Sequence, residues 1–85
     1  MTERPAHLDL SIDTFGLLCP MPIIKTAEAL KSLEVGSVIE VIATDPGASQ
    51  DLRDWCKANR QDYIGDDVHG RIHRIWIKKT EAGAR

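Results

Sequence analysis

Cysteine is scarce in this chain, and its placement excludes several kinds of protein. Two cysteines in 85 residues are too few for a disulfide framework. Cys19 and Cys56 do not stand at the spacing of a Cys-x-x-Cys redox pair, which argues against a thioredoxin-like function. With the three histidines they form no paired cluster at metal-ligand spacing. We therefore predict no metal site and no cofactor.

Excess positive charge and long hydrophobic runs are also absent. The chain has 11 basic and 13 acidic residues, a net charge of -2. Such a balance gives no overall field to attract nucleic acid or an anionic membrane. No apolar run approaches the roughly 20 residues of a membrane span, and the N-terminus has no apolar signal region. We expect a cytoplasmic protein that contacts neither membrane nor nucleic acid directly.

What remains is an ordinary globular composition, with 42% hydrophobic and 28% charged residues. A chain of this length forms one modest core and has no room for a large cofactor and a separate substrate domain. We predict a single domain over residues 1–85, with frayed tails at residues 1–6 and 80–85.

Hydrophobic periodicity predicts six elements. They are a strand over 7–13, a helix from Pro20 closed by Gly36, a strand over 37–43, a helix over 48–59, a short strand over 61–65 and a strand over 71–79. Residues 66–70 are predicted to form a turn. The βαβαββ order, with a right-handed first crossover, predicts an α/β two-layer sandwich with two helices on one face of a mixed four-stranded sheet. The other sheet face is expected to be open to water or to a partner.

The most informative stretch lies between the first strand and the first helix. It reads Gly16-Leu17-Leu18-Cys19-Pro20-Met21-Pro22 and places Cys19 at the expected N-cap of the helix, with Pro20 as its first residue. A thiol at the positive end of the helix macrodipole has a lowered pKa and is a better nucleophile. No neighbouring cysteine could collapse a persulfide on Cys19 into a disulfide. The pattern therefore favours carrying sulfur over passing electrons.

These residues resemble a known family. The stretch from Asp13 to Pro22 matches the D-x-x-G-x-x-C-P-x-P signature of the TusA (SirA-like) sulfur-carrier family. The likeness continues through Thr44-Asp45-Pro46, Asp51, Trp55-Cys56 and the segment from Arg74 to Lys78. It covers nearly the whole chain at matching spacing, so it is far more specific than a lone Cys-Pro pair.

The resemblance implies a two-layer sandwich in which Cys19 carries sulfane sulfur as a persulfide. The implied donor is a cysteine desulfurase or a rhodanese-type protein, and the implied acceptor is a DsrE-like protein or a thiolation enzyme. The acceptors of the family serve tRNA thiolation, molybdenum-cofactor supply or sulfur oxidation. The family assigns Asp13, Gly16, Pro20 and Pro22 to shaping the loop. Met21 stands where tRNA-thiolating members often carry glutamate, which counts against the tRNA role and leaves the carrier role untouched.

Simpler interpretations stand beside these. Cys56 shares a helix face with Leu52 and Trp55 and is expected to be a core residue. Trp76 is either a core residue or an exposed anchor for a partner. For the chain as a whole, one rival is a regulatory or interaction module that uses the Cys-Pro loop as a rigid docking corner. Another is a thiol-based redox sensor that forms a sulfenic acid on Cys19.

Overall fold

The computed structural model describes residue 5, residues 7–18 and residues 20–82 of the chain. The elements follow in the predicted βαβαββ order. They are β1 (Leu10–Thr14), α1 (Met21–Lys31), β2 (Val38–Ala43), α2 (Ala48–Ala58), β3 (Asp62–His69) and β4 (Ile72–Lys78). Each helix has 11 residues, and among the described residues neither helix is long and apolar enough to cross a membrane.

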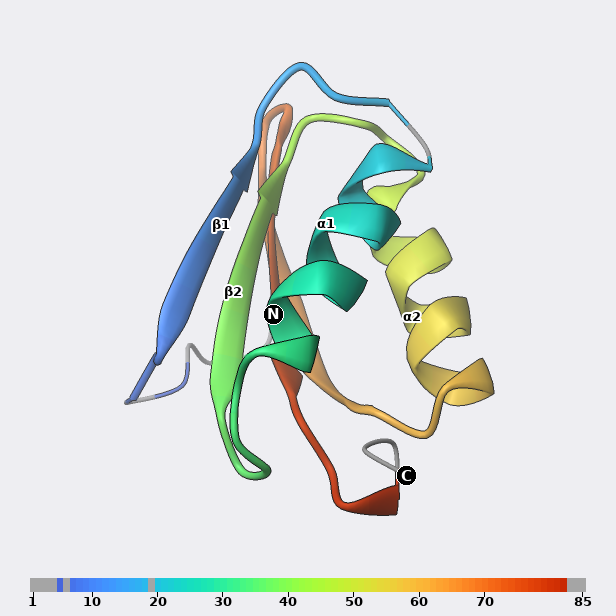
Figure 1. Cartoon of the computed structure of the whole chain (residues 1–85). Coiled ribbons are helices and arrows are strands. Elements are labelled where there is room, and N and C mark those ends of the chain that lie inside the picture. Colours follow the sequence, from blue (N-terminus) through green and yellow to red (C-terminus); the bar gives the residue numbers. More distant parts are fainter. Residues whose placement is uncertain (1–4, 6, 19, 83–85) are drawn as a thin grey trace.

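The strands form one mixed sheet in the order β1-β2-β4-β3. β1 pairs with β2 in parallel, whereas β4 pairs antiparallel with both β2 and β3. Figure 1 shows α1 and α2 side by side on one face of this sheet. The predicted two-layer sandwich is therefore confirmed. Because β1 and β2 run in parallel, the two loops that lead into the helices leave the same end of the sheet.

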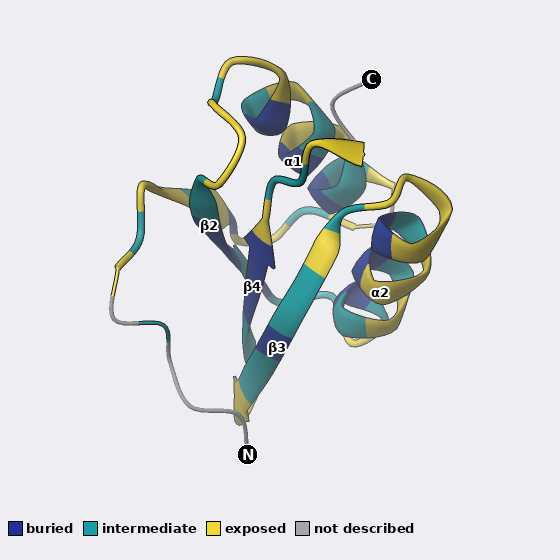
Figure 2. Ribbon diagram, turned by 90° about the horizontal axis from the view of Figure 1, so that it is seen from below, coloured by how far each residue is buried: buried dark blue, intermediate teal, exposed yellow. Residues whose placement is uncertain are grey.

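The core lies between the helices and the sheet. Alternate residues of the two central strands face the helices, namely Ile39, Val41 and Ala43 of β2 with Ile75 and Ile77 of β4. The helices meet them with Leu30 of α1 and with Ala48, Leu52 and Cys56 of α2, all buried. Spacing by four residues places those α2 side chains on one stripe of the helix. In Figure 2 the buried residues line the space between the two layers.

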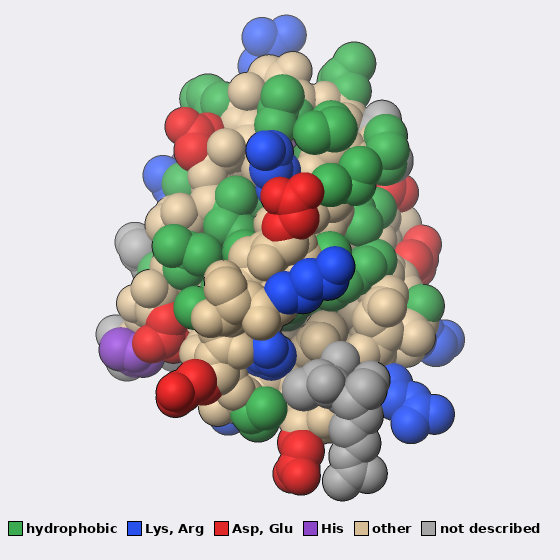
Figure 3. Space-filling model, viewed as in Figure 1, with side chains coloured by type: hydrophobic (Ala, Val, Ile, Leu, Met, Phe, Trp, Pro, Cys, Tyr) green, Lys and Arg blue, Asp and Glu red, His purple; other side chains and the backbone are tan. Residues whose placement is uncertain are grey.

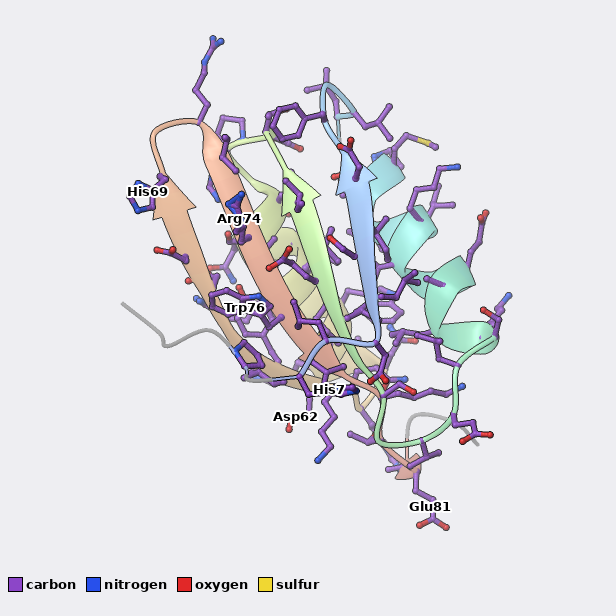
Figure 4. The ribbon with its side chains drawn as sticks, turned by 90° about the vertical axis from the view of Figure 1, so that its left-hand side faces the viewer. His7, Asp62, His69, Arg74, Trp76 and Glu81 are labelled. Atoms are coloured by element: carbon purple, nitrogen blue, oxygen red, sulfur yellow. The ribbon has the colours of Figure 1, made fainter. Side chains whose placement is uncertain are left out.

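The sheet face opposite the helices is not open at its centre, so that prediction is wrong there. Trp76 is 1% exposed and Glu40 is 3% exposed, and both lie on this face. Trp76 Nε1–H donates to Glu40 Oε2 at 2.9 Å, and the Ser11 hydroxyl donates to Glu40 Oε1 at 3.3 Å. Figure 4 shows Trp76 on this face and the chain around His7 crossing its lower end. A polar network therefore occupies the middle of the face, and Trp76 is not an exposed anchor.

β3 is longer than predicted, because it includes most of the segment expected to form a turn. Asp66 pairs with Ile75 and Asp67 with Arg74, so cross-strand pairing overrides the weak strand propensity of aspartate. Asp66 is also held by Tyr63, whose hydroxyl donates to its Oδ2 at 2.6 Å. The turn falls at Gly70, whose φ of +60° suits glycine.

The first strand begins later than predicted, at Leu10 instead of His7. The reason lies at Asp9, whose carboxylate accepts the Val38 N–H at 2.8 Å where a backbone carbonyl would continue the ladder. This bond is the main cause that lowers the pKa of Asp9, and His7 contributes as well. The side chain of Asp9 thus sets the boundary of the strand.

Lys79, the residue that follows β4, holds the C-terminal end of α1. The helix ends at Lys31, and Gly36 lies in the following turn instead of closing it. Lys79 Nζ donates to the carbonyls of Leu30 and Leu33 at 2.6 Å each, which neutralises the negative end of the helix. Within the expected C-terminal tail, Thr80 is hydrogen-bonded to Gln61 and to the Arg60 carbonyl.

We predict that Trp76→Phe lowers the free energy of unfolding by about 2 kcal/mol, because the buried Glu40 carboxylate loses a hydrogen bond. Urea unfolding followed by circular dichroism measures the change. Trp55→Phe is the matched control, since Trp55 is half-buried and its indole N–H has no hydrogen-bond partner among the described residues. Equal losses in the two variants would show that the bond to Glu40 contributes nothing specific.

Candidate functional site

The candidate site is the loop between β1 and α1, at the end of the sheet where β1 and β2 finish (Figure 1). Cys19 itself lies outside the described residues, so the site is built here from the residues on either side of it. The other predicted site residues, Asp13, Gly16, Pro20 and Pro22, are all described. Asp13 lies in β1, Gly16 lies in the turn that follows it, and the two prolines belong to the start of α1.

The turn after β1 is held by hydrogen bonds from its own backbone. The Phe15 N–H donates to Asp13 Oδ1 at 2.9 Å, and the Leu17 N–H donates to the Thr14 carbonyl at 3.0 Å. Gly16 has a φ of +75°, a conformation that side chains disfavour. The side chain of Asp13 thus holds the turn that contains Gly16, directly before the segment that contains Cys19.

Two threonines tie this turn to the neighbouring strand. Thr44, in the loop after β2, accepts the Gly16 N–H on its hydroxyl oxygen at 3.0 Å. Thr14 is fully buried and donates to the Ile42 carbonyl at 2.6 Å. Sequence reasoning missed both roles, although Thr44 belongs to the Thr44-Asp45-Pro46 segment that the family resemblance included. Pairing of β1 with β2 brings Thr44 to Gly16, and no local pattern reveals it.

On the other side of Cys19, the start of α1 differs by one residue from the prediction. The helix begins at Met21, and its N-cap is Pro20, so Cys19 precedes the cap instead of occupying it. The Met21 N–H donates to the Leu18 carbonyl at 2.9 Å, and the Ile24 N–H donates to the Pro20 carbonyl at 3.1 Å. The first bond joins the residues on either side of the Cys19 position, and the second is the first intrahelical bond of α1. The helix can therefore begin later than a cap-based prediction places it.

Pro22 anchors this end of α1 to the rest of the fold. Its side chain is buried, and its carbonyl accepts the Thr26 hydroxyl at 2.8 Å. It shares a narrow crevice with Asp45, Ala48 and Asp51 of the neighbouring loop and helix. Pro22 thus fixes the direction in which α1 leaves the loop.

The start of α1 has no carboxylate of its own. The first turn of α1 contains no acidic residue, whereas the first turn of α2 contains Asp51. The described residues place no side-chain hydrogen bond on the α1 cap. The positive end of the α1 macrodipole is therefore not neutralised from within its own first turn, and the nearest described carboxylates on the crevice beside Pro22 are those of Asp45 and Asp51.

Large apolar side chains project around the loop. Leu18 is 69% exposed, Phe15 is 53% exposed and Ile24 is 40% exposed. Figure 3 shows hydrophobic side chains gathered at the upper end of the helical face, where α1 begins. Exposed apolar side chains grouped beside a reactive loop are typical of a protein-binding surface. We call Phe15, Leu18 and Ile24 the apolar rim.

The second cysteine lies in the core. Cys56 is 1% exposed, packs in the core and is a free thiol. Burial raises the pKa of Cys56 to about 12, and the charge of Asp62 adds to the effect. The expected packing role of Cys56 is therefore the one that its surroundings support.

The histidines do not assemble a metal centre in the described part of the chain, where no group of three potential ligands occurs. His7 and His69 lie at opposite ends of the sheet (Figure 4). His7 contacts Asp9 at 2.8 Å, and His73 Nδ1 contacts the Ser49 hydroxyl at 2.9 Å.

We predict that Thr44→Val speeds amide hydrogen exchange at Gly16 by about fivefold, because the Gly16 N–H loses its partner and a net hydrogen bond is worth about 1 kcal/mol. Thr44→Ser keeps the hydroxyl and should exchange like the wild type. Exchange followed by nuclear magnetic resonance measures both. Unchanged protection in Thr44→Val would show that Thr44 does not hold the turn.

We also predict that Cys19→Ser protein resists alkylation by iodoacetamide at pH 8 while folded and takes up one adduct in urea. With its pKa near 12, Cys56 has almost no thiolate at that pH, and it is out of reach of the reagent. Intact mass counts the adducts. Rapid labelling of the folded variant would show that Cys56 is accessible.

The chain is similar to several known proteins. Residues 10–79 match the family model described as Sulfurtransferase TusA. The chain is 33% identical over 75 residues to the sulfur carrier protein TusA of Allochromatium vinosum, covering 88% of this chain and 99% of that protein. It is 43% identical over 68 residues, 80% of its length, to YrkF of Bacillus subtilis, which is named as a candidate sulfur carrier protein. The chain spans only 37% of YrkF.

A solved structure shares the fold. The SirA-like protein of Desulfitobacterium hafniense superposes with a TM-score of 0.74, over 85% of this chain and 99% of that one, at 24% identity. The family match covers every strand and helix described above, together with the loop that contains Cys19. The chain therefore belongs to the TusA sulfurtransferase family, whose relatives named here are described as sulfur carriers.

Proposed function

We propose that this chain is a sulfur carrier that holds sulfane sulfur as a persulfide on Cys19 and relays it between proteins. The observation that carries the proposal is the braced loop around Cys19. It is held on one side by Thr44 and on the other by the buried Pro22, and it faces a helix end without a first-turn carboxylate. The residues on both sides of Cys19 are thus anchored to the sheet and to the core.

The chemistry is thiol exchange and needs no metal ion. The Cys19 thiolate attacks the outer sulfur of a donor persulfide, a new S–S bond forms, and the donor cysteine leaves as a thiolate. An acceptor thiolate then attacks the outer sulfur on Cys19, which leaves as a thiolate in turn. The positive end of α1 stabilises that leaving group, so both steps benefit from the same feature.

Partner proteins complete the site. The loop lies at the surface, and the apolar rim stands beside it with Leu18 69% exposed. A partner that covers the rim would exclude water from the exchanging sulfurs and align them. We infer that the donor is a cysteine desulfurase or a rhodanese-type protein and that the acceptor is a DsrE-like protein or a thiolation enzyme, in the cytoplasm.

The carrier would serve sulfur oxidation, tRNA thiolation or molybdenum-cofactor supply. Met21 bears on this choice, because it opens α1 next to the apolar rim. An apolar residue at that position suits a partner with an apolar contact surface more than one that pairs with a carboxylate. This favours an acceptor other than the tRNA-thiolation enzymes.

We predict that wild-type protein gains one sulfur atom when incubated with a cysteine desulfurase, pyridoxal phosphate and cysteine, and that a reductant removes it. Cys19→Ser should gain none, because it lacks the attacking thiolate. Cys56→Ala is the matched control and should load like the wild type, since Cys56 is buried in the core. Intact mass under non-reducing conditions measures all three.

Other results would change the sulfur-bearing residue or the function that we assign. A gain in Cys19→Ser that Cys56→Ala lacks would place the sulfur on Cys56. No gain in the wild type, with both an active desulfurase and a thiosulfate-charged rhodanese, would favour the rival function of an interaction module. Retention of cellular function by Cys19→Ser would support that rival directly.

A further inference from the structure

A hollow opens beside the Cys19 loop, at the same end of the sheet. It has a volume of about 800 Å³ and lies between the turn after β1, the loop after β2 and the β3–β4 turn. Its lining residues are Phe15, Gly16, Thr44, Pro46, His69, Gly70, Arg71, Ile72 and His73. Figure 1 shows these three connections at one end of the molecule. Ligands of open α/β sheets commonly bind at this end, outside the carboxyl ends of parallel strands.

The hollow differs in charge from the molecule as a whole. The chain has a net charge of -2, with 13 acidic residues. Among the described residues that line the hollow there is no aspartate or glutamate, and the ionisable side chains are His69, Arg71 and His73. Asp45, which lies between two lining residues in sequence, borders the separate crevice beside Pro22. The charge of the hollow therefore suits an anion.

Two features make the basic residues usable as ligand donors. Arg71 is exposed on the β3–β4 turn, and none of the described residues pairs with its guanidinium. His73 Nδ1 is fixed at 2.9 Å from the Ser49 hydroxyl, which orients the ring, and none of the described residues hydrogen-bonds to its Nε2. Guanidinium and imidazole groups bind oxyanions and carboxylates through charge-assisted hydrogen bonds.

The hollow is also close to the reacting loop along the chain. Gly16 lines it, and Cys19 follows three residues later. Three residues span at most about 11 Å even when fully extended. A molecule of several atoms in the hollow can therefore extend to the loop. Phe15, Pro46 and Ile72 supply an apolar wall against which an uncharged part of such a molecule can pack.

We propose that the hollow binds an anionic sulfane-sulfur compound of low molecular weight, from which Cys19 takes sulfur without a protein donor. The inference rests on the proposed function, because it adds a second source for the same persulfide. Direct attack brings two anions together, and cations that bind the donor reduce this repulsion. The apolar rim is uncharged and would not reduce the repulsion between the two anions.

The transfer balances for the two simplest donors. With thiosulfate, the Cys19 sulfur bonds to the outer sulfur, the S–S bond to the SO₃ group breaks, and sulfite leaves with the electron pair. With glutathione persulfide, the same bond forms at the outer sulfur and glutathione leaves as a thiolate, while the proton stays on the transferred sulfur. Neither reaction needs an oxidant or a reductant.

The test is loading by small molecules alone. Wild-type protein is incubated with sodium thiosulfate or with glutathione persulfide, without any protein donor, and persulfide formation is followed by intact mass. We expect one added sulfur atom, absent in Cys19→Ser, and an initial rate about tenfold lower in Arg71→Gln. Loading by thiosulfate alone, by glutathione persulfide alone or by both supports the proposal and identifies the ligand.

Controls separate the hollow from the rest of the surface. Lys57→Gln removes an exposed cation near the C-terminal end of α2 and should load at the wild-type rate. An equal loss in Lys57→Gln, or no loss in Arg71→Gln, would overturn the proposal. An equal loss of loading by a cysteine desulfurase in Arg71→Gln would also overturn it, because Arg71 would then act in protein docking. Protein that the desulfurase loads but neither small molecule loads refutes the hollow and leaves the carrier function standing, whereas failure of every donor refutes the function itself.

Discussion

The parallel pairing of β1 with β2 is the constraint on which the rest of the site depends. In a parallel pair both strands finish at the same edge, and here Thr14 pairs with Ala43. The loops that follow, one before α1 and one before α2, are thereby brought side by side. The hydrogen bond from the Gly16 N–H to the Thr44 hydroxyl joins these two loops. The hydroxyl of the buried Thr14 donates to the Ile42 carbonyl and so holds the ends of β1 and β2 together. The reacting loop is thus positioned by the sheet.

The two faces of the sheet support this end of the molecule differently. The face toward the helices is apolar, with Ile39, Val41, Ile75 and Ile77 fully buried. The opposite face buries Glu40 against the indole of Trp76. A buried carboxylate with directed partners contributes specificity of pairing, because a shifted register would leave it unsatisfied. The stability of the fold therefore comes from the body of the sandwich. The loop at its end exposes Leu18 and Phe15 because the core does not need them.

This separation of a stable body from an exposed loop explains how so small a protein can serve in sulfur transfer. A chain of this size has little volume for an enclosed active site. The end of the sheet instead offers three open features around one loop, namely a helix end, the apolar rim and a hollow whose ionisable side chains are basic. In the two functions that we propose, proteins bind at the rim and small anions bind in the hollow, and both deliver sulfur to the same cysteine by the same exchange reaction.

The sequence by itself determined the element order, the sandwich, the core stripe of α2 and the family, because each depends on local periodicity or on a contiguous motif from Asp13 to Pro22. Only the tertiary structure decided that Asp66 and Asp67 extend β3, that Trp76 is buried, and that α1 starts at Met21 with Pro20 as its cap. It also joined Thr44 to Gly16 and gathered His69, Arg71 and His73 beside Phe15. The physical reason is that most of these features depend on cross-strand partners distant in sequence, and propensity cannot show which residues the sheet will place opposite one another. The start of α1 is a local feature, but helix boundaries are set by the bonds of the first turn and are not fixed by the cap pattern alone.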